Sequence, residues 1–381
     1  MQFMRRYFCA FVCLTSFAHA GVWVSAPTNN SNVATTVQYV AKATSSCSKG
    51  IAAMGIYTAP NQLVYTVPGA SLNTLLTLNP GTYNTVVQEW DNCGWTSKTN
   101  VTINVRASTS SVPRSSHIWI ITEENRSYES VIGSQYMPYY NTLANTYALA
   151  AQYYANRHSS LPALMWLVAG QDVTTNNNTT SCFNVDNVVR HLLLQGMTWK
   201  SYQEDLPYAG YTGLSWGNYV RRHNPLIDFT DVCAPSQNLN SVPYTQLAKD
   251  MANAATPNYI YITPNLQHDA HDGTRAQADA WLSKEVPKIL ARPEFQSGGD
   301  GLLFIVWDEG NLNTDNRCNS WTSSGCGGRV ATLVIGPKVK HNFQSQVLYH
   351  HENLLRTVCD ALGFNSCPGA GANAAPMSDF F

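Results

Sequence analysis

Three apolar runs that each end in a cluster of polar side chains constrain the fold of this chain most strongly. They are HIWIITEEN at 117–125, YIYITPNLQHDAHDG at 259–273 and GLLFIVWDEGN at 301–311. Apolar runs without alternation are typical of strands buried on both faces, as in a parallel sheet covered by helices. Adjacent carboxylates at the end of such a strand, as at Asp308 and Glu309, repel each other and are costly to remove from water. A neutralising group is therefore expected at these strand ends.

Segments with helical spacing separate these strands along the chain. Helices are expected at 137–151, 161–170, 185–196, 274–291 and 351–363, and further strands at 197–203 and 330–336. This alternation predicts an α/β domain over residues 117–381, with a largely parallel sheet and helices on both faces. Ligands of such sheets bind outside the carboxyl ends of the strands, so the polar clusters are expected to converge there.

Residues 21–106 have a different sequence pattern from the rest of the chain. About seven short runs rich in β-branched and aromatic residues alternate with turn clusters such as TNNSN, APNQ and NPG. This spacing predicts an all-β sandwich of immunoglobulin-like type. Residues 107–116, rich in Ser and containing Pro, are expected to form a linker to the second domain.

The N-terminus predicts export. Residues 1–20 carry Arg5 and Arg6, then a short apolar run, then Ala18 and Ala20 in a small-x-small cleavage pattern. This is the pattern of a secretory signal peptide, and the apolar run is too short to span a bilayer. A secreted or periplasmic location is therefore expected, with no transmembrane segment.

The cysteines outside the signal agree with an oxidising compartment. Their even number favours disulfides, whereas the close CxxC or CxxH spacing of a zinc site is absent from the sequence. Many pairings are formally open, and order along the chain favours 47 with 93, 182 with 233, 318 with 326, and 359 with 367.

Charge excludes two classes of partner. The 23 Lys and Arg residues almost balance the 24 Asp and Glu residues, and no Lys- or Arg-rich run is present in the sequence. No basic field exists to recruit nucleic acid or an anionic membrane.

The polar clusters have two interpretations. A single strand ending in Asp-Glu is more often a helix cap or a solvated loop, and HDAHDG alone could be a turn with exposed histidines. Three such endings in one domain favour a site that binds a divalent cation. The oxygen-rich set suits Mg²⁺, Ca²⁺ or Mn²⁺, and Zn²⁺ stays open.

A series of motifs, in order between residues 117 and 363, resembles one known family. They are EENRSYESVIG, HSSLPALMWLVAG, MTWKSYQEDLP, RRHNPLIDF, ITPNLQHDAHDG, LLFIVWDEG, GGRVATLVIGP and HENLLRTVCDALG. The chain resembles the phosphoesterases of the acid phosphatase and phospholipase C type. The resemblance implies an alkaline-phosphatase-like fold for this domain, and it does not cover the N-terminal sandwich.

The resemblance also implies roles for individual residues. It places metal ligands at Glu124, Asn125, Asp308 and Glu309. It makes the histidines phosphate contacts or proton donors, and it assigns the substrate-binding positions His271, Asp272, His351 and Asn265.

Ser160 is the residue that the resemblance places as nucleophile, at the start of an expected helix and on the same metal ion. A serine hydroxyl is a weak nucleophile unless a cation lowers its pKa. Ser159 is the rival, and a role for Ser160 as a mere helix cap is the alternative. His158 is expected to contact phosphate. Ala163 departs from the family, which usually has Asn there.

These features predict a secreted metal-dependent phosphoesterase acting on phosphate mono- or diesters through a phosphoseryl intermediate. The alternative is a catalytically impaired protein that binds a surface or glycan through its immunoglobulin-like domain. The substitution at Ala163 favours this alternative, and the presence of Ser160 together with the acidic positions argues against it.

Overall fold

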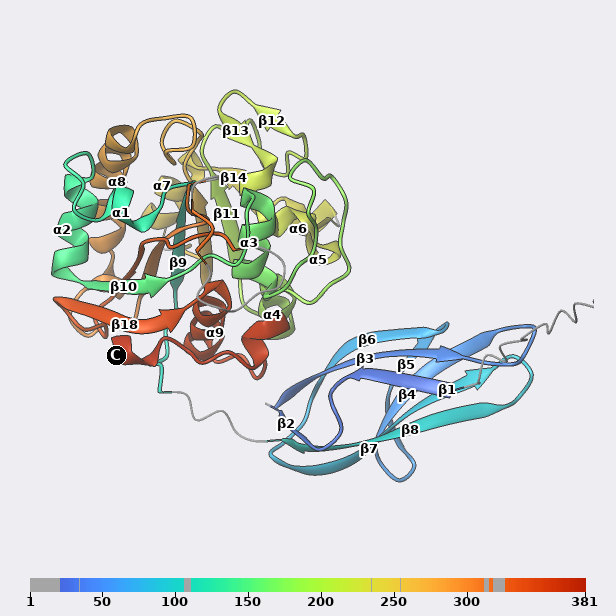
Figure 1. The fold of residues 1–381 in the computed structure, drawn as a ribbon. Helices are drawn as coiled ribbons and strands as arrows, with labels where there is room; N and C mark the ends of the chain where they lie inside the picture. The colour runs from blue at the N-terminus through green and yellow to red at the C-terminus, as the bar shows by residue number, and fades with distance from the viewer. Residues whose placement is uncertain are drawn as a thin grey trace, which may run out of the picture. The chain divides into compact units, whose positions relative to one another are not determined.

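A computed structural model of the chain divides into two compact units, residues 1–107 and 108–381. It describes residues 21–33, 35–105, 111–233, 235–253, 255–311, 315–317 and 326–381. The predicted signal peptide and part of the predicted linker lie outside these ranges. Figure 1 shows both units as ribbons.

The first unit is built of two β-sheets around one core. One sheet has the strand order β1-β3-β6 and the other β2-β8-β7-β4-β5. Buried apolar side chains from both sheets, among them Tyr39, Ile56 and Val87, form a single hydrophobic cluster. The strands are β1 (Gly21–Ala26), β2 (Ser31–Val33), β3 (Thr36–Thr44), β4 (Ile51–Ala59), β5 (Gln62–Pro68), β6 (Ser71–Thr77), β7 (Gly81–Asp91) and β8 (Thr96–Val105). The unit is thus a β-sandwich with one strand more than the seven expected.

The second unit contains an eight-stranded mixed sheet with the order β14-β11-β15-β9-β16-β17-β10-β18. β17 is antiparallel to both of its neighbours, and the other strands are parallel to one another. The strands are β9 (Ile118–Glu123), β10 (Ala148–Tyr153), β11 (Trp199–Gln203), β14 (Ser241–Pro243), β15 (Tyr259–Thr263), β16 (Leu302–Trp307), β17 (Thr332–Ile335) and β18 (Phe343–Tyr349). A short hairpin, β12 (Ser215–Trp216) with β13 (Tyr219–Val220), lies outside this sheet.

Helices cover both faces of this sheet. Figure 1 shows α2 and α8 on one side of β9, and α3 and α9 on the other. Every residue of β9, β15 and β16 is buried, which explains their unbroken apolar runs. The helices are α1 (Tyr128–Val131), α2 (Pro138–Thr146), α3 (Ser160–Ala169), α4 (Val188–Leu194), α5 (Thr230–Cys233), α6 (Pro235–Asn238), α7 (Thr245–Ala252), α8 (Arg275–Leu290) and α9 (His351–Leu362).

The expected helix at 137–151 is wrong in its second half. α2 ends at Thr146, and β10 begins at Ala148. Strand β10 is inserted between β17 and β18, and Ala148, Leu149 and Ala150 pair with both neighbours. Small residues with good helix propensity therefore form a buried strand, because sheet pairing on both sides outweighs local preference.

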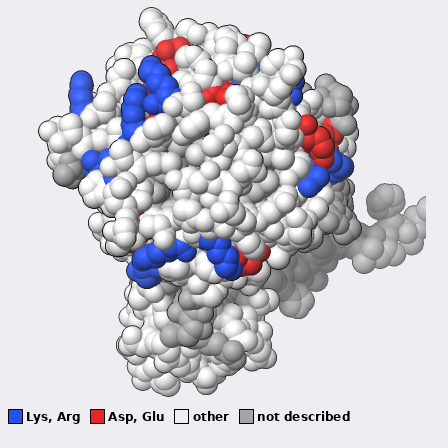
Figure 2. Space-filling model, turned by 90° about the vertical axis from the view of Figure 1, so that its left-hand side faces the viewer, with Lys and Arg blue, Asp and Glu red and all other residues white. Residues whose placement is uncertain are grey.

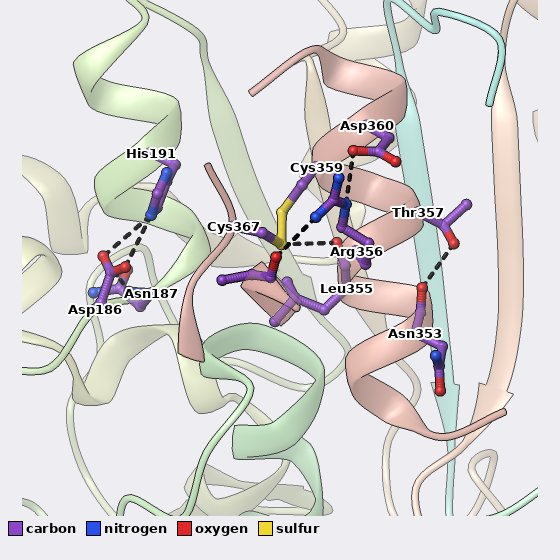
Figure 3. Close-up of a disulfide and its surroundings, with 11 residues drawn as sticks. Asp186, Asn187, His191, Asn353, Leu355, Arg356, Thr357, Cys359, Asp360 and Cys367 are labelled. Carbon is purple, nitrogen blue, oxygen red and sulfur yellow. Dashed lines mark hydrogen bonds and ion pairs between the residues drawn. A yellow bond between two sulfur atoms is a disulfide. The ribbon is translucent and has the colours of Figure 1, made fainter. Parts of the chain in front are cut away.

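Disulfides tie down loops in both units. The predicted pairs Cys47–Cys93, Cys182–Cys233 and Cys359–Cys367 are present, whereas the fourth predicted pair includes Cys318, which lies outside the described residues. Figure 3 shows Cys359–Cys367 joining the C-terminal half of α9 to the segment that follows it. The same view shows the Thr357 side chain bonded to the Asn353 carbonyl within the helix. These contacts anchor the helix whose first residue is His351.

The charged side chains are sparsely distributed on the surface. On the face in Figure 2, Lys and Arg stand in small groups, with Asp and Glu in similar small groups among them. A broad basic surface of the kind that binds nucleic acid is absent from this face. In the described part of the chain, no helix has the length and apolar character needed to cross a membrane.

Candidate active site

The carboxyl ends of β15, β9 and β16 meet at one edge of the sheet, because these strands are adjacent and parallel. Backbone hydrogen bonds continue past the strands: Glu124 N donates to Asp269 O at 2.8 Å, and Asp308 N donates to Glu123 O at 3.0 Å. Asn125 N donates to Asp308 Oδ1 at 2.9 Å. The three polar clusters seen in the sequence therefore lie side by side.

Three buried carboxylates form the centre of this edge. Glu124, Asp308 and Glu309 each place a carboxylate oxygen within 4.8 Å of the others, and each residue is at most 1% exposed. Burial and the charge of Glu309 raise the pKa of Asp308 to about 7. Burial, and then the charge of Asp308, raises the pKa of Glu124 well above its usual range.

Asp308 Oδ2 has no hydrogen-bond donor among the described residues, and Glu124 Oε1 forms no hydrogen bond there but lies 3.2 Å from His223 Nε2. A buried carboxylate without a compensating charge destabilises the folded protein, and a bound cation commonly provides that charge. Carboxylate oxygens with free lone pairs are also the donors that hard divalent cations prefer. The residues present therefore fit a divalent cation at this point.

Ser160 opens α3 and points toward the carboxylates. It is 2% exposed, and its Oγ donates to Glu124 Oε2 at 2.8 Å. Ser159 is the N-cap residue of α3, and its side chain makes no capping hydrogen bond. The Ser160 hydroxyl is thus committed to the cluster and not to capping the helix. Ala163, within the same helix, is fully buried.

His158 contacts the cluster from the segment that precedes α3. Its Nδ1 forms an ion pair with Glu309 Oε2, and its Nε2 lies 2.8 Å from the Asp315 carbonyl oxygen. Burial alone would lower the pKa of His158, but Glu309 outweighs this effect and the pKa is raised. Both ring nitrogens have protein partners, so His158 orients and neutralises Glu309.

His351 differs from the expectation that it contacts phosphate. The residue is fully buried. Its Nε2 lies 2.7 Å from the Asp308 carbonyl oxygen, and its Nδ1 lies 3.1 Å from the Tyr153 hydroxyl. Burial lowers the pKa of His351 to about 3, which keeps the ring neutral. Neither nitrogen is left for a substrate, because the ring holds the backbone at Asp308.

The segment after β15 contains the remaining predicted residues, at the rim of the site. His271 Nδ1 pairs with Asp272 Oδ1 at 2.7 Å, and the Asp272 side chain is 52% exposed. Asn265 does not join the cluster. Its Oδ1 accepts hydrogen bonds from the backbone of Gln267 and His268, and its Nδ2 donates to Asp205. Asn265 thus stabilises its own loop, and the substrate-binding role expected for it stays a prediction.

His223 is a site residue to which the sequence analysis assigned no role. It is 2% exposed, with Nε2 3.2 Å from Glu124 Oε1 and Nδ1 3.1 Å from Asp269 Oδ2. Burial lowers its pKa well below the usual value. The ring of His271 lies beside it, with centroids 5.5 Å apart. The only sequence signal was the histidine of RRHNP, which follows two arginines in an irregular segment.

Comparison with known proteins places this chain in a family. The Phosphoesterase family matches residues 133–364, which is more than half of the chain. The chain belongs to the Phosphoesterase family. It is therefore a hydrolase that acts on phosphate esters, and the site described above lies mainly within the matched region.

Two relatives that are similar in sequence to this phosphoesterase are phosphatases by name. A phosphatidylinositol-3-phosphatase of Mycobacterium tuberculosis is 30% identical over 71% of this chain and 85% of its own length. An acid phosphatase of Aspergillus fumigatus is 28% identical over 65% of this chain and 54% of its own length. The chain thus spans about half the length of the fungal enzyme.

Distant likeness to solved structures is also found. A protein in the alkaline phosphatase superfamily from Vibrio parahaemolyticus aligns with 67% of this chain and 68% of its own, at 9% identity and a TM-score of 0.46. Likeness of this degree says nothing about substrate or mechanism.

Proposed function

We propose that this phosphoesterase is a secreted, metal-dependent enzyme that hydrolyses phosphate mono- or diesters with Ser160 as its nucleophile. The observation that carries the proposal is the hydrogen bond of Ser160 Oγ to Glu124 Oε2, at 2.8 Å, inside a cluster of three buried carboxylates. A serine with a purely structural role would not need to lie among buried carboxylates, whose removal from water destabilises the folded protein.

The proposed metal ligands are Glu124, Asn125, Ser160, Asp308 and Glu309. Support comes from Asp308 Oδ2, which has no donor among the described residues, and from the mutual proximity of the acidic groups. A divalent cation supplies positive charge that lowers the pKa of a neighbouring hydroxyl and offsets charge on the phosphate. The oxygen-rich donor set suits Mg²⁺, Ca²⁺ or Mn²⁺, with Zn²⁺ as the alternative.

In the proposed reaction the Ser160 oxygen attacks phosphorus, and a new P–O bond forms as the bond to the ester oxygen breaks. The leaving oxygen gains a proton in place of the one that Ser160 loses, and water then hydrolyses the phosphoserine to restore Ser160 and release phosphate from a monoester, or a phosphate monoester from a diester. We assign His271 and Asp272, at the rim, to contact with the substrate. His158 and His351 act as positioning residues, through Glu309 and the Asp308 backbone.

We infer secretion from the signal-peptide pattern of residues 1–20, supported by the three disulfides of the described chain. We also infer that the N-terminal β-sandwich is of immunoglobulin-like type, which its two sheets with a common core support. Its proposed role is attachment to a surface or glycan.

The alternative is a binding protein that has lost activity. Ala163 favours it, since a methyl group stands where the family usually has an amide that contacts phosphate. The retained cluster around Ser160 favours the enzyme.

Hydrolysis of p-nitrophenyl phosphate and of its phosphocholine ester, each with and without a chelator, tests the proposal. We expect turnover of at least one ester, lost on chelation and recovered with a divalent cation. Absence of turnover of both esters with every metal and at every pH would contradict the proposal and favour the binding-protein alternative. The ester that is cleaved faster decides between phosphatase and phospholipase C specificity.

A further inference from the structure

Arginines near the site differ from the others of the described catalytic unit in their partners. Most arginines of the unit pair with a carboxylate, as in Arg157–Asp172, Arg190–Asp231, Arg221–Asp228, Arg292–Glu294, Arg317–Glu129, Arg329–Glu129 and Arg356–Asp360. Arg126, Arg275 and Arg222 have no carboxylate partner within the described ranges, and Arg222 Nη2 lies 3.5 Å from His271 Nε2. Since an unpaired guanidinium attracts anions and Arg126 and Arg275 share a cavity, these two positions mark a candidate anion site.

Arg126 and Arg275 line the same cavity. It has a volume of about 470 Å³, and its walls include Thr274, Tyr136 and Asn311. Among the described residues that line it, none is Asp or Glu. Two cations that line one cavity repel each other, and an anion between them would relieve this repulsion.

Contacts within the protein hold both side chains without neutralising them. Arg126 Nη1 donates to the Asn125 carbonyl oxygen at 2.8 Å. Arg275 Nη1 donates to the Ser130 carbonyl oxygen, and its guanidinium carbon lies 5.3 Å from the centroid of the Tyr136 ring. Arg275 is also the first residue of α8, whose N-terminal dipole adds positive potential. Prearranged guanidinium groups of this kind suit phosphate oxygens, which they can contact with two hydrogen bonds.

The cavity adjoins the proposed reaction centre. Arg126 follows Asn125 directly, and Asn311 lies two residues after Glu309. The backbone of Asn125 joins the two places, because its N–H donates to Asp308 Oδ1 at 2.9 Å and its carbonyl oxygen accepts from Arg126 Nη1 at 2.8 Å. A molecule whose phosphate lies at Ser160 can therefore extend toward Arg126 and Arg275.

We propose that Arg126 and Arg275 form a subsite for a second phosphate group, so that the preferred substrates carry two phosphates. This inference rests on the proposed phosphoesterase function and narrows its substrate class. The second phosphate belongs either to a soluble bisphosphate or to the headgroup of a phospholipid, because the recognising chemistry is the same.

The test compares kcat/KM for fructose 1,6-bisphosphate and fructose 6-phosphate. A second arm compares phosphatidylinositol 3-phosphate, held in phosphatidylcholine vesicles, with p-nitrophenyl phosphate. We expect a preference for the doubly phosphorylated substrate of about tenfold or more in one of the arms, the size expected for a charge-assisted contact. The arm that shows the preference identifies the source of the second phosphate.

Substitutions test whether Arg275 causes the preference for the doubly phosphorylated substrate. Arg275→Gln should reduce the ratio of the two kcat/KM values to near one, and Arg275→Lys should restore part of it. Lys284→Gln, which removes an exposed cation from the same helix, should keep the ratio of the wild type. Equal rates in both arms for the wild type, or a preference that Arg275→Gln retains, would overturn the subsite.

A measurement of ligand binding tests the subsite independently of the proposed hydrolytic function. Calorimetry with fructose 1,6-bisphosphate and the Ser160→Ala protein needs no turnover. Tighter binding of the bisphosphate than of fructose 6-phosphate, lost on adding Arg275→Gln, supports the subsite even if no ester is cleaved. Equal binding of the two sugars contradicts it, even if p-nitrophenyl phosphate is hydrolysed.

Discussion

The Ser160 hydroxyl donates a hydrogen bond to Glu124 over 2.8 Å, although the two residues belong to different elements of the fold. Glu124 directly follows β9, and Ser160 is the first residue of α3. Parallel pairing of β9 with β16 brings Asp308 to the same point. The contact thus joins the proposed nucleophile to the proposed metal ligands in one buried cluster.

Loss of the Ser160 hydroxyl should stop turnover while leaving the protein folded. We expect Ser160→Ala to lower kcat on p-nitrophenyl phosphate by about 10³-fold or more, as for other enzymes that lose a nucleophile. Ser159→Ala is the matched control and should lose far less, because the Ser159 side chain caps nothing. Near wild-type rates for Ser160→Ala, with loss in Ser159→Ala, would move the nucleophile by one residue.

Substitution at Asp308 should have opposite effects on stability and on metal binding. In metal-free protein at neutral pH, Asp308→Asn removes a buried charge that opposes Glu309 and Glu124. We expect its free energy of unfolding to rise by about 1 kcal/mol, since unpaired buried charges destabilise. Added divalent cation should raise the Tm of the wild type but not of this variant.

Glu285→Gln provides the control for this experiment, because Glu285 is a buried carboxylate that pairs with Lys288 on α8, outside the cluster. It should retain the metal-induced rise in Tm. Elemental analysis gives an independent readout, and wild-type metal content in Asp308→Asn would remove Asp308 from the ligand set.

His351 should affect the position of the Asp308 backbone and not the binding of substrate. His351→Gln leaves the buried Tyr153 hydroxyl or the Asp308 carbonyl without its partner, at a cost of about 1–3 kcal/mol in stability. We expect kcat to fall with KM little changed, because the Asp308 backbone loses its support. His117→Gln, at the opposite end of β9, should leave kcat within about twofold. A rise in KM with unchanged kcat would instead favour direct contact with substrate.

Acidification should lower the free energy of unfolding through the protonation of Glu129 and Asp315. Hydrogen bonds from Arg317 lower the pKa of Glu129 to about 2. Burial raises the pKa of Asp315, but Arg317 outweighs burial and lowers it to about 2. Folded pKa values below the ordinary ones stabilise the protein above about pH 4, and this stabilisation is lost as the pH falls toward about 2.

Arg317→Gln should therefore shift acid unfolding, followed by circular dichroism, to a higher pH. Lys284→Gln, which removes a largely exposed lysine and leaves Glu285 paired with Lys288, should leave the midpoint in place. An unchanged midpoint in Arg317→Gln would show that the two carboxylates titrate alike in the folded and unfolded states.

Periodicity predicted the buried strands well and the strands near the sheet edge poorly. β9, β15 and β16 lie where their apolar runs indicated, because burial on both faces leaves an unbroken signal. β18 was not expected, since its sequence FQSQVLY is polar and most of its residues are exposed or half-buried. β10 was taken for helix because alanines carry no strand signal, and only pairing with distant segments makes it a strand.

The candidate site was predictable where it follows those strands. Glu124, Asp308 and Glu309 stood out because carboxylates ended apolar runs. His223 could not be found this way, since it lies in a short 3-10 turn with no periodicity of its own. Asn265 and His351 had suitable chemistry in the sequence, but their hydrogen bonds to the protein depend on folded geometry that no local pattern encodes.

Trapping the covalent intermediate tests the central claim most directly. Metal-loaded protein is mixed with p-nitrophenyl phosphate, quenched in acid during turnover, digested and analysed by mass spectrometry, with Ser160→Ala treated in the same way. The account predicts a phosphate on Ser160 of the wild type, assigned by fragmentation, and none on the variant. Steady turnover with no phosphate on the peptide, or with phosphate on Ser159, would contradict it.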